Sequence, residues 1–429
     1  MTHRWNKLDN AAKIFPSAGT KAETQVFRLS CELTAPVDSN LLRQALRETV
    51  KIFDVYQYVM KRGLFWYYLE HSALIPEVRE EYKPPCAPLY DKNETRPLYE
   101  VTYYRNRINL EVYHVLSDGT GATRFLQTLV SNYLALVNNT PAPPLSFDAS
   151  QTQMENDSFQ KYYNNKAKKQ HQHFSKAYRL RGFKYPENRI GIITGRLSVK
   201  AVLAAAHSYN TTLTGFLCAC LFDAIGSEMP TRAKKRPVVL SIPVNLRSYF
   251  PSESARNFFG LINVEYDFST ENSSFERIVE KVQVELKQNL RADKLANSMN
   301  QYLSAEHNPF ARLAPLPLKN LCLGIAYRAS MRRSTAAVSN TGVISMPEQF
   351  CGDIRAFDLF TGTNRIQACV CSYQDTLSIS FTSPFVSADI QRAFFRRLTA
   401  RGIAVELLTC LPDENSTERI KKEKERDIL

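Results

Sequence analysis

Residues 107–136 change their hydrophobic repeat within a few positions, and this change constrains the fold more than any other feature of the chain. In residues 107–114 the apolar side chains alternate, as in a strand with one buried face. In residues 122–136 they recur at helical spacing, and the intervening DGTG at 118–121 is typical of a turn and a helix start. A strand that passes through a tight turn into a helix predicts a layered α/β structure. It also places His114 at a strand end, where folds often present catalytic groups.

Strand and helix patterns alternate along the rest of the chain. The expected strands are residues 23–33, 63–69, 98–104, 189–197, 237–244, 258–266, 342–344, 369–373 and 377–382. The expected helices are residues 39–53, 199–208, 213–225, 274–290 and 387–401, and residues 82–97 are expected to form a loop. Asp38 or Ser39 would cap the first helix, and Thr211 or Thr212 the third. This order predicts mixed sheets with helices packed on them.

The 429 residues are enough for two domains of ordinary size. We expect one subdomain at residues 1–140, a second at residues 187–415 and a charged tail at residues 416–429. Residues 141–186 interrupt the periodic patterns with a proline-rich and then a basic stretch, and we expect them to form a linker between the two halves.

The chain carries a surplus of basic residues, 55 Lys and Arg against 42 Asp and Glu, which gives a net charge of +13. Such a surplus favours an anionic partner, which could be nucleic acid, a membrane surface or a phosphorylated co-substrate. The charge is spread out except near residues 166–169, 179–184, 232–236 and 419–426, and no nucleic-acid motif accompanies it, so we expect no nucleic-acid partner. No apolar run of about 18 residues is present and the polar start lacks an apolar signal core, so we expect a cytoplasmic protein with no membrane partner.

The cysteines and histidines give little support for a metal site. The Cys-x-Cys pairs at residues 218–220 and 369–371 lack zinc or redox spacing, so we expect buried, reduced thiols. The His-x-His at residues 171–173 has no third ligand nearby, and an exposed loop is the favoured interpretation. No metal site is predicted.

The motif His114-x-x-x-Asp118-Gly119 at the strand-to-helix turn resembles the signature of the chloramphenicol acetyltransferase superfamily. That superfamily includes dihydrolipoyl acetyltransferases, nonribosomal peptide condensation domains, polyketide-associated acyltransferases and alcohol acetyltransferases. Residues 4–16, 183–225 and 243–260 resemble bacterial proteins of the alcohol-acetyltransferase-like group. The segment Ser339-Asn340-Thr-Gly resembles the Ser-Asn-x-Gly of dihydrolipoyl acetyltransferases.

Two departures from the family patterns reduce the number of superfamily groups that the chain resembles. Tyr113 stands where condensation domains usually have a second histidine, and the Asp-Phe-Gly-Trp-Gly motif of plant acyltransferases is missing. These departures argue against a plant-type enzyme and disfavour an amide-forming condensation role. The resemblance implies two acyltransferase-like subdomains, each a mixed sheet with helices packed on it, and an active-site tunnel between them. Because one chain supplies both halves, it also implies a monomer.

The resemblance assigns His114 as a general base that takes a proton from an acceptor hydroxyl, thiol or amine as that atom attacks an acyl thioester. No acyl-enzyme is needed, because the thioester is already activated. Asp118 is expected to turn away from the histidine and pair with an arginine, for which Arg247 is the candidate. Asp118 acting only as a helix N-cap is the alternative, and both roles can hold together.

The remaining site residues follow from the same resemblance. A side chain at Gly119 would crowd the turn or block the substrate channel. Ser339 is the candidate donor to the oxyanion, with Asn340 supporting or lining the site, although a Ser-Asn turn at a strand end is an alternative. Asn257 is a weaker candidate that could serve only to stabilise a loop.

The function expected from these residues is transfer of an acyl group, most simply acetyl, from acyl-coenzyme A to the hydroxyl of a small-molecule acceptor, with no permanently bound cofactor. The neighbouring alternative uses an acyl carrier protein as donor. From a different class, the fold could serve as a non-catalytic binding module, which the intact His114, Asp118 and Gly119 disfavour.

Overall fold

The computed structural model describes residues 4–144, 147, 150–164, 176–271 and 273–411. The His-x-His at 171–173 and the charged tail at 416–429 lie outside these residues. Within them, no helix combines the length and the apolar character needed to cross a membrane.

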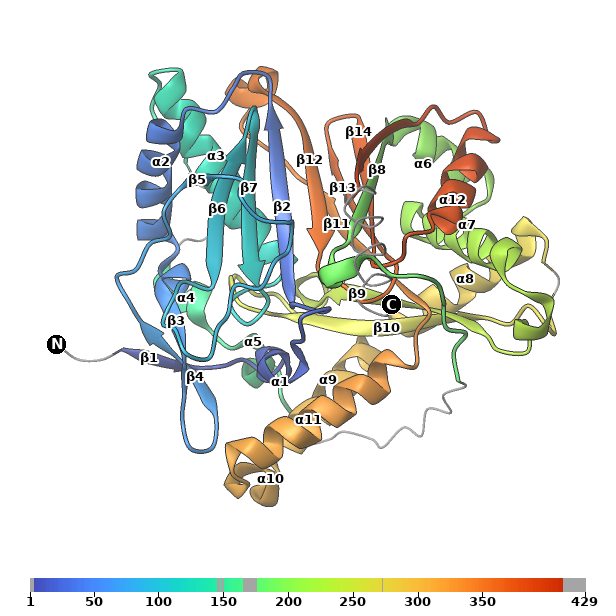
Figure 1. The fold of residues 1–429 in the computed structure, drawn as a ribbon, viewed down its shortest axis with the longest axis horizontal. Helices are drawn as coiled ribbons and strands as arrows, with labels where there is room; N and C mark the ends of the chain where they lie inside the picture. The colour runs from blue at the N-terminus through green and yellow to red at the C-terminus, as the bar shows by residue number, and fades with distance from the viewer. Residues whose placement is uncertain (1–3, 145–146, 148–149, 165–175, 272, 412–429) are drawn as a thin grey trace, which may run out of the picture.

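The motif sequence belongs to a five-stranded sheet with the order β12-β2-β7-β6-β5. All neighbouring strands are antiparallel except β5 and β6. The strands are β2 (Val26–Leu33), β5 (Arg79–Glu80), β6 (Tyr99–Tyr104), β7 (Arg107–Tyr113) and β12 (Ile354–Thr361). Helices α2 (Ser39–Ile52) and α3 (Gly119–Val137) pack together on one face of this sheet (Figure 1).

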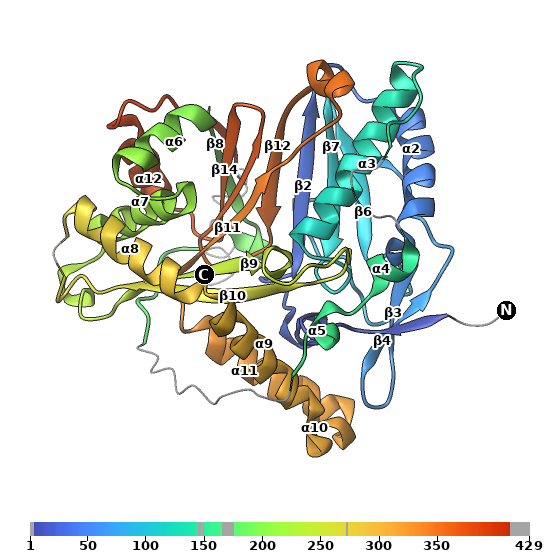
Figure 2. The same cartoon turned by 180° about the vertical axis from the view of Figure 1, so that it is seen from behind.

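A seven-stranded mixed sheet lies beside the first, with the order β10-β9-β11-β13-β14-β8-β15. Its strands are β8 (Gly191–Ser198), β9 (Val238–Asn245), β10 (Phe259–Tyr266), β11 (Ala336–Val343), β13 (Gln367–Tyr373), β14 (Thr376–Ser383) and β15 (Glu406–Cys410). Its helices are α6 (Val199–Ser208), α7 (Leu213–Glu228), α8 (Phe275–Asn289) and α12 (Asp389–Thr399). These helices lie on the side away from the five-stranded sheet, so the two sheets are enclosed between outer layers of helices (Figures 1 and 2).

Strand β12 links the two halves, because it follows β11 in the chain yet pairs with β2 in the five-stranded sheet. Arg196 on β8 strengthens the contact by pairing with Glu32 on β2 and Asp358 on β12, at 2.7 and 3.1 Å. The side-by-side placement of the two sheets therefore depends on a segment far from the motif in sequence.

Smaller elements complete the molecule. A three-stranded sheet contains β1 (Trp5–Lys7), β3 (Tyr58–Arg62) and β4 (Tyr67–His71). Short helices are α1 (Phe15–Ala18), α4 (Gln151–Glu155) and α5 (Ser158–Lys161), the last two inside the segment expected to be a linker. Helices α9 (Ala292–His307), α10 (Pro309–Leu313) and α11 (Leu316–Met331) project from the body of the protein (Figures 1 and 2).

The predicted class, mixed α/β with helices packed on sheets, is confirmed. The helix at 199–208 agrees with α6 at both ends, and the expected caps are present, since the side chains of Asp38 and Thr212 accept hydrogen bonds from the first turns of α2 and α7. The four thiols of the Cys-x-Cys pairs are buried as expected. The strand predicted at 63–69 is wrong in part, because residues 63–66 form the turn between β3 and β4. The division of the chain at residues 140 and 187 stays a prediction.

Candidate active site

His114 follows the last residue of β7, and its ring is half-buried among aromatic side chains. Its backbone N–H donates to the carbonyl of Gln25 at 2.9 Å, which continues the pairing with β2. The ring centroid lies 4.9 Å from that of Phe15, 4.8 Å from Phe27 and 5.6 Å from Phe259. Burial among these rings lowers the pKa of His114 below its ordinary 6.5, so the imidazole is neutral at pH 7.

The amide of Asn257 determines which ring nitrogen of His114 carries the proton. Its Nδ2 donates to the carbonyl of His114 at 2.9 Å and to a carboxylate oxygen of Asp9 at 3.2 Å. These two acceptors fix the orientation of the amide, so Oδ1, at 3.1 Å from Nδ1 of His114, is the acceptor of an Nδ1–H. The neutral ring then has its lone pair on Nε2.

Asp9 is a buried member of this site that the sequence did not single out. Its side chain also accepts a hydrogen bond from the backbone N–H of Ala12 at 2.7 Å and lies 3.7 Å from the guanidinium of Arg256. Burial raises the pKa of Asp9, and Arg256 and the neighbouring donors oppose that shift. Nothing in the sequence marks Asp9, because Asn257 and Arg256, the partners that join it to the site, are more than 200 residues away.

Asp118 has both of the roles considered from the sequence. One carboxylate oxygen accepts a hydrogen bond from the N–H of Gly121 at 3.0 Å and caps α3. The other accepts from the N–H of Phe258 at 2.8 Å and pairs with Arg247 at 2.7 Å. The side chains of Asp118 and Arg247 are only 5% and 6% exposed, so the pair is buried. The hydrogen bonds of the Asp118 carboxylate therefore go to the turn and to the second half of the chain.

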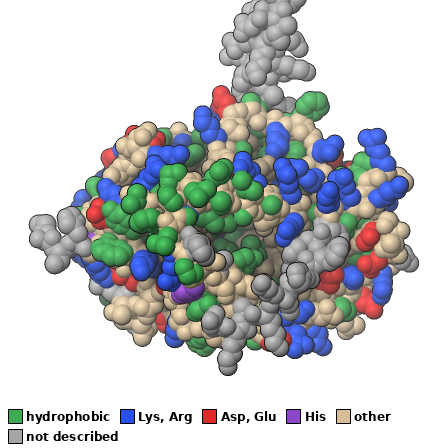
Figure 3. Space-filling view, turned by 90° about the horizontal axis from the view of Figure 1, so that it is seen from below, with side chains coloured by type: hydrophobic (Ala, Val, Ile, Leu, Met, Phe, Trp, Pro, Cys, Tyr) green, Lys and Arg blue, Asp and Glu red, His purple; other side chains and the backbone are tan. Residues whose placement is uncertain are grey.

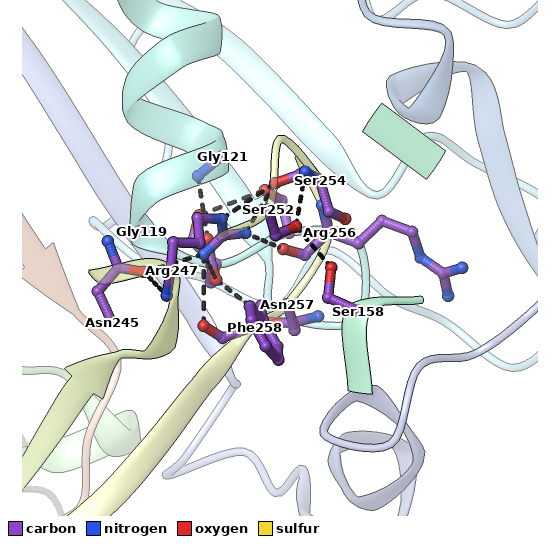
Figure 4. Close-up of polar contacts among 12 residues, drawn as sticks. Gly119, Gly121, Ser158, Asn245, Arg247, Ser252, Ser254, Arg256, Asn257 and Phe258 are labelled. Carbon is purple, nitrogen blue, oxygen red and sulfur yellow. Dashed lines mark hydrogen bonds and ion pairs between the residues drawn. The ribbon is translucent and has the colours of Figure 1, made fainter. Parts of the chain in front are cut away.

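Arg247 in turn holds the loop that carries Asn257 (Figure 4). Its guanidinium donates to the carbonyl of Ser254 at 2.8 Å and to that of Arg256 at 2.6 Å. Ser117, beside the motif aspartate, also donates to the loop, at the carbonyl of Ala255, 2.5 Å away. The start of α3 and the 254–258 loop are thus joined as one unit, and that unit positions Asn257 against His114.

The two motif glycines differ in what surrounds them. A Cβ on Gly119 would lie 3.4 Å from the side chain of Thr341, across the cavity described below. A Cβ on Gly121 would lie 2.1 Å from the carbonyl oxygen of Ala255 and 2.3 Å from Oγ of Ser117. The crowding expected at the turn therefore falls on Gly121, whereas Gly119 faces the cavity.

A cavity of about 140 Å³ opens in front of His114. It brings together His114, Asp118 and Gly119 from the five-stranded half with Ser339 and Asn340 of β11. Its other lining residues are Phe27, Thr120, Pro243, Val244, Asn245, Phe259, Thr341, Leu359, Thr361, Gln367 and Cys369. Arg247 and Asn257 lie behind this wall and act on the residues that line it.

Asn340 is held in place by two hydrogen bonds. Its Nδ2 donates to Oγ1 of Thr214 at 2.9 Å, and its Oδ1 accepts from the N–H of Gly342 at 2.8 Å. Gly342 has a φ of +80°, and the register with β13 shifts between Asn340 and Val343. Ser339 and Asn340 therefore lie within β11, just before this register shift, and they line the cavity. The alternative of a Ser-Asn turn at the strand end is wrong, and the donor role of Ser339 stays a prediction.

Comparison with known proteins is consistent with this architecture. The sequence model of the alcohol acetyltransferase family matches residues 133–386, more than half of the chain, although the match begins beyond the His114 motif. No curated protein sequence matches.

Solved structures share the fold over nearly the whole chain. Fusarium graminearum TRI101, complexed with coenzyme A and T-2 mycotoxin, has a TM-score of 0.62 at 11% identity, covering 92% of this chain and 97% of that one. The trichothecene 15-O-acetyltransferase TRI3 of Fusarium sporotrichioides gives 0.56 at 10%, covering 92% and 94%. The first condensation domain of the calcium-dependent antibiotic synthetase, with a substrate analogue, gives 0.60 at 16%, covering 93% and 96%.

These similarities confirm the resemblance to the chloramphenicol acetyltransferase-like superfamily that the motif indicated. At identities of 10–16% the structural matches establish the fold and not the substrate. The family match is the more specific of the two findings, and by it this chain belongs to the alcohol acetyltransferase family.

Proposed function

We propose that the protein transfers a short acyl group, most simply acetyl, from a coenzyme A thioester to the hydroxyl of a small-molecule acceptor, with His114 as general base. The observation that carries this proposal is the contact of 3.1 Å between Nδ1 of His114 and Oδ1 of Asn257. Because that contact holds the proton on Nδ1, the lone pair of Nε2 is free to accept the proton of an acceptor hydroxyl.

In the proposed reaction one proton moves from the acceptor hydroxyl to His114 and then from His114 to the leaving thiolate. Nε2 takes the hydroxyl proton as the acceptor oxygen bonds to the thioester carbonyl carbon. The resulting tetrahedral oxyanion needs a hydrogen-bond donor, and Ser339 on the opposite wall is our candidate. When the carbon–sulfur bond breaks, the imidazolium returns the proton to the departing thiolate, which gives the ester, the free thiol of coenzyme A and neutral His114.

A direct transfer without an acyl-enzyme is supported by the protonation of the thiol that lines the cavity. Cys369 lines the same cavity, and burial raises the pKa of Cys369 to about 12. A thiol with that pKa stays protonated at neutral pH and is a poor nucleophile. The acceptor, held beside His114, is then the group that attacks the thioester.

The size of the cavity supports a short acyl group. Its volume of about 140 Å³ is below the range of roughly 300–1,000 Å³ that drug-sized ligands occupy. The identity of the acyl donor is less well determined than the size of the acyl group. TRI101 was crystallised with coenzyme A, while the other fold neighbours include condensation domains. An acyl carrier protein is accordingly the alternative donor.

The test is thiol release from acetyl-, hexanoyl- and decanoyl-coenzyme A with a panel of alcohols, amines and thiols. We expect acceptor-dependent release that is fastest with acetyl and falls by about 10²–10⁴-fold in His114→Ala. His207→Ala, an exposed histidine at the end of α6, is the matched control and should keep the wild-type rate.

Equal rates in wild type and His114→Ala would exclude His114 as the base. Release from an acyl-pantetheinyl carrier protein, with none from any coenzyme A thioester, would establish the alternative donor. Binding of acceptor or coenzyme A with no transfer from either donor would favour the non-catalytic module.

A further inference from the structure

Helix α11 (Leu316–Met331) directs Lys319 and Tyr327 toward the protein. Lys319 donates from Nζ to the carbonyls of Phe65 and Arg312, at 3.0 and 2.9 Å, and lies 3.6 Å from the ring centroid of Trp66. Further along, Tyr327 donates from its hydroxyl to Glu23 at 2.7 Å. Lys319 and Tyr327 are therefore used in internal contacts.

The opposite face of α11 is apolar and exposed to solvent. Leu318, Leu321 and Ile325 follow one another at helical spacing and are 52%, 57% and 54% exposed. A helix on the surface of a globular protein ordinarily has the reverse arrangement, with its apolar stripe toward the core. Contiguous exposed apolar surface of this kind marks an interaction site.

Two segments that adjoin α11 also carry exposed apolar side chains. Leu313 of α10 and Leu64 of the β3–β4 turn are each 73% exposed, and Phe65 is 40% exposed. The turn is fastened to α11, because the N–H of Leu316 donates to the carbonyl of Leu64 at 3.0 Å. We call the combined surface the apolar ridge; it consists of Leu64, Phe65, Leu313, Leu318, Leu321 and Ile325.

The segment that forms most of the ridge carries only basic charges. Residues 307–347 contain no Asp or Glu. The exposed arginines of this segment are Arg312, Arg328, Arg332 and Arg333. Seen from this side, hydrophobic side chains gather on the face and Lys and Arg side chains lie next to them (Figure 3).

The shape of the ridge distinguishes between possible partners. Helix α10 lies at the far end of helices that project from the body, so the ridge residues of α10 and α11 belong to a protruding part of the fold (Figures 1 and 2). A protrusion can enter the headgroup region of a bilayer, and a basic rim is attracted to anionic headgroups. A helical or extended peptide would instead need a groove to occupy.

We propose that the apolar ridge docks this protein onto an anionic lipid surface, with the leucines and Ile325 entering the interface and the arginines contacting headgroups. The protein would lie on the membrane surface by means of the ridge. The sequence led us to expect no membrane partner because it contains no apolar run of about 18 residues. The ridge gives no such signal, since it combines residues 64–65 with residues 313–325 and exists only in the folded chain. This inference is independent of the acyl-transfer chemistry.

The test is flotation of the full-length protein with vesicles of phosphatidylcholine alone and of phosphatidylcholine mixed with phosphatidylglycerol. We expect binding to the anionic vesicles that weakens as NaCl rises from about 0.1 M to about 0.5 M. The double variant Leu321→Ser/Ile325→Ser should bind about 100-fold less well, since each buried aliphatic side chain contributes about tenfold. The matched control is Leu261→Ser/Val284→Ser, which removes two equally exposed side chains from β10 and α8.

A second readout reports whether the ridge itself touches lipid. The chain has two tryptophans, and Trp5→Phe leaves Trp66, beside Lys319 at the base of the ridge, as the fluorophore. Its emission should shift to shorter wavelength with anionic vesicles and not with neutral ones.

Three results would overturn the proposal: no binding to either vesicle, equal binding by the ridge and control variants, or a dimer in sedimentation that the ridge variant abolishes while no vesicle is bound. The last result would make the ridge an interface between two copies. Activity on a water-soluble alcohol should be unchanged in the ridge variant, so a failure of this proposal is distinguishable from a failure of the proposed chemistry.

Discussion

Asn257 makes hydrogen bonds to both the side chain and the backbone of His114. Its Oδ1 accepts from the ring at 3.1 Å, and its Nδ2 donates to the backbone carbonyl at 2.9 Å. The amide is only 1% exposed and reaches the histidine across 143 residues of sequence. Through Asn257, the second half of the chain sets the tautomer of the proposed base in the first half.

Replacing Asn257 with alanine should lower kcat by about 10- to 100-fold, as loss of a partner that orients a functional histidine does elsewhere. The hydrogen bond that the ring donates to Asn257 raises the pKa of His114 against the effect of burial, so its loss should also move the acid limb of the pH–rate profile to lower pH. Asn289→Ala, which removes an amide on α8, is the control. A lower rate with an unmoved pH profile would indicate a structural role only.

The pH dependence of the wild type follows from the lowered pKa of His114. Protonation below that pKa removes the base, so kcat/KM should rise with pH along a limb of unit slope and reach its plateau by about pH 7. The midpoint should lie below 6.5, the ordinary value for histidine. A midpoint above 7 in a profile measured from about pH 4.5 to 8.5 would contradict both the burial argument and the assignment of the base.

The Asp118–Arg247 pair should contribute far more to folding than a surface pair. Asp118→Asn keeps a capping oxygen but leaves the arginine without its counter-charge in a site that is about 5% exposed, so we expect a loss of about 3 kcal/mol in unfolding free energy. The matched change Glu280→Gln breaks a pair with Arg277 whose side chains are 62% and 49% exposed, and should cost about 0.5 kcal/mol or less. Urea titrations of both variants make the comparison, and equal losses would contradict it.

Changing the two motif glycines to alanine should have different effects, on stability at Gly121 and on kinetics at Gly119. Gly121→Ala places a methyl group against the carbonyl of Ala255, which is backbone and cannot easily move, so a loss of about 2 kcal/mol or more is expected. Gly119→Ala meets only the methyl group of Thr341 at contact distance and should stay within about 1 kcal/mol of wild type. Because the new methyl group of the alanine at position 119 enters the cavity, KM or kcat should change in the folded protein. Similar melting curves for the two variants would contradict this distinction.

Much of the fold and part of the site could be predicted from local patterns. Helix α6 and the caps at Asp38 and Thr212 depend on residues within one helical turn, and these were predicted correctly. The Asp118–Arg247 pair was expected only through the family resemblance, since 129 residues separate its members. Local patterns carry no information about which distant residues meet.

The elements that were missed share a physical reason. Helix α11 is apolar on its exposed face, so a search for an amphipathic stripe facing a core does not find it. Strand β12 was missed because its pairing partner is β2, more than 300 residues earlier, and no local turn signal records that pairing. Asp9 went unnoticed for the same reason, since its role depends on Asn257.

The position of β12 in the chain has a consequence for the order in which the protein is made. The other strands of its sheet all lie before residue 114, whereas β12 begins at Ile354. At a synthesis rate of about 5–20 residues per second, β2 leaves the ribosome roughly 16–60 s before the strand that covers its edge. During that interval the nascent chain presents an unpaired strand edge, the kind of surface that chaperones protect and that seeds aggregation. The synthesis of residues 354–361 therefore determines when the first half can become native.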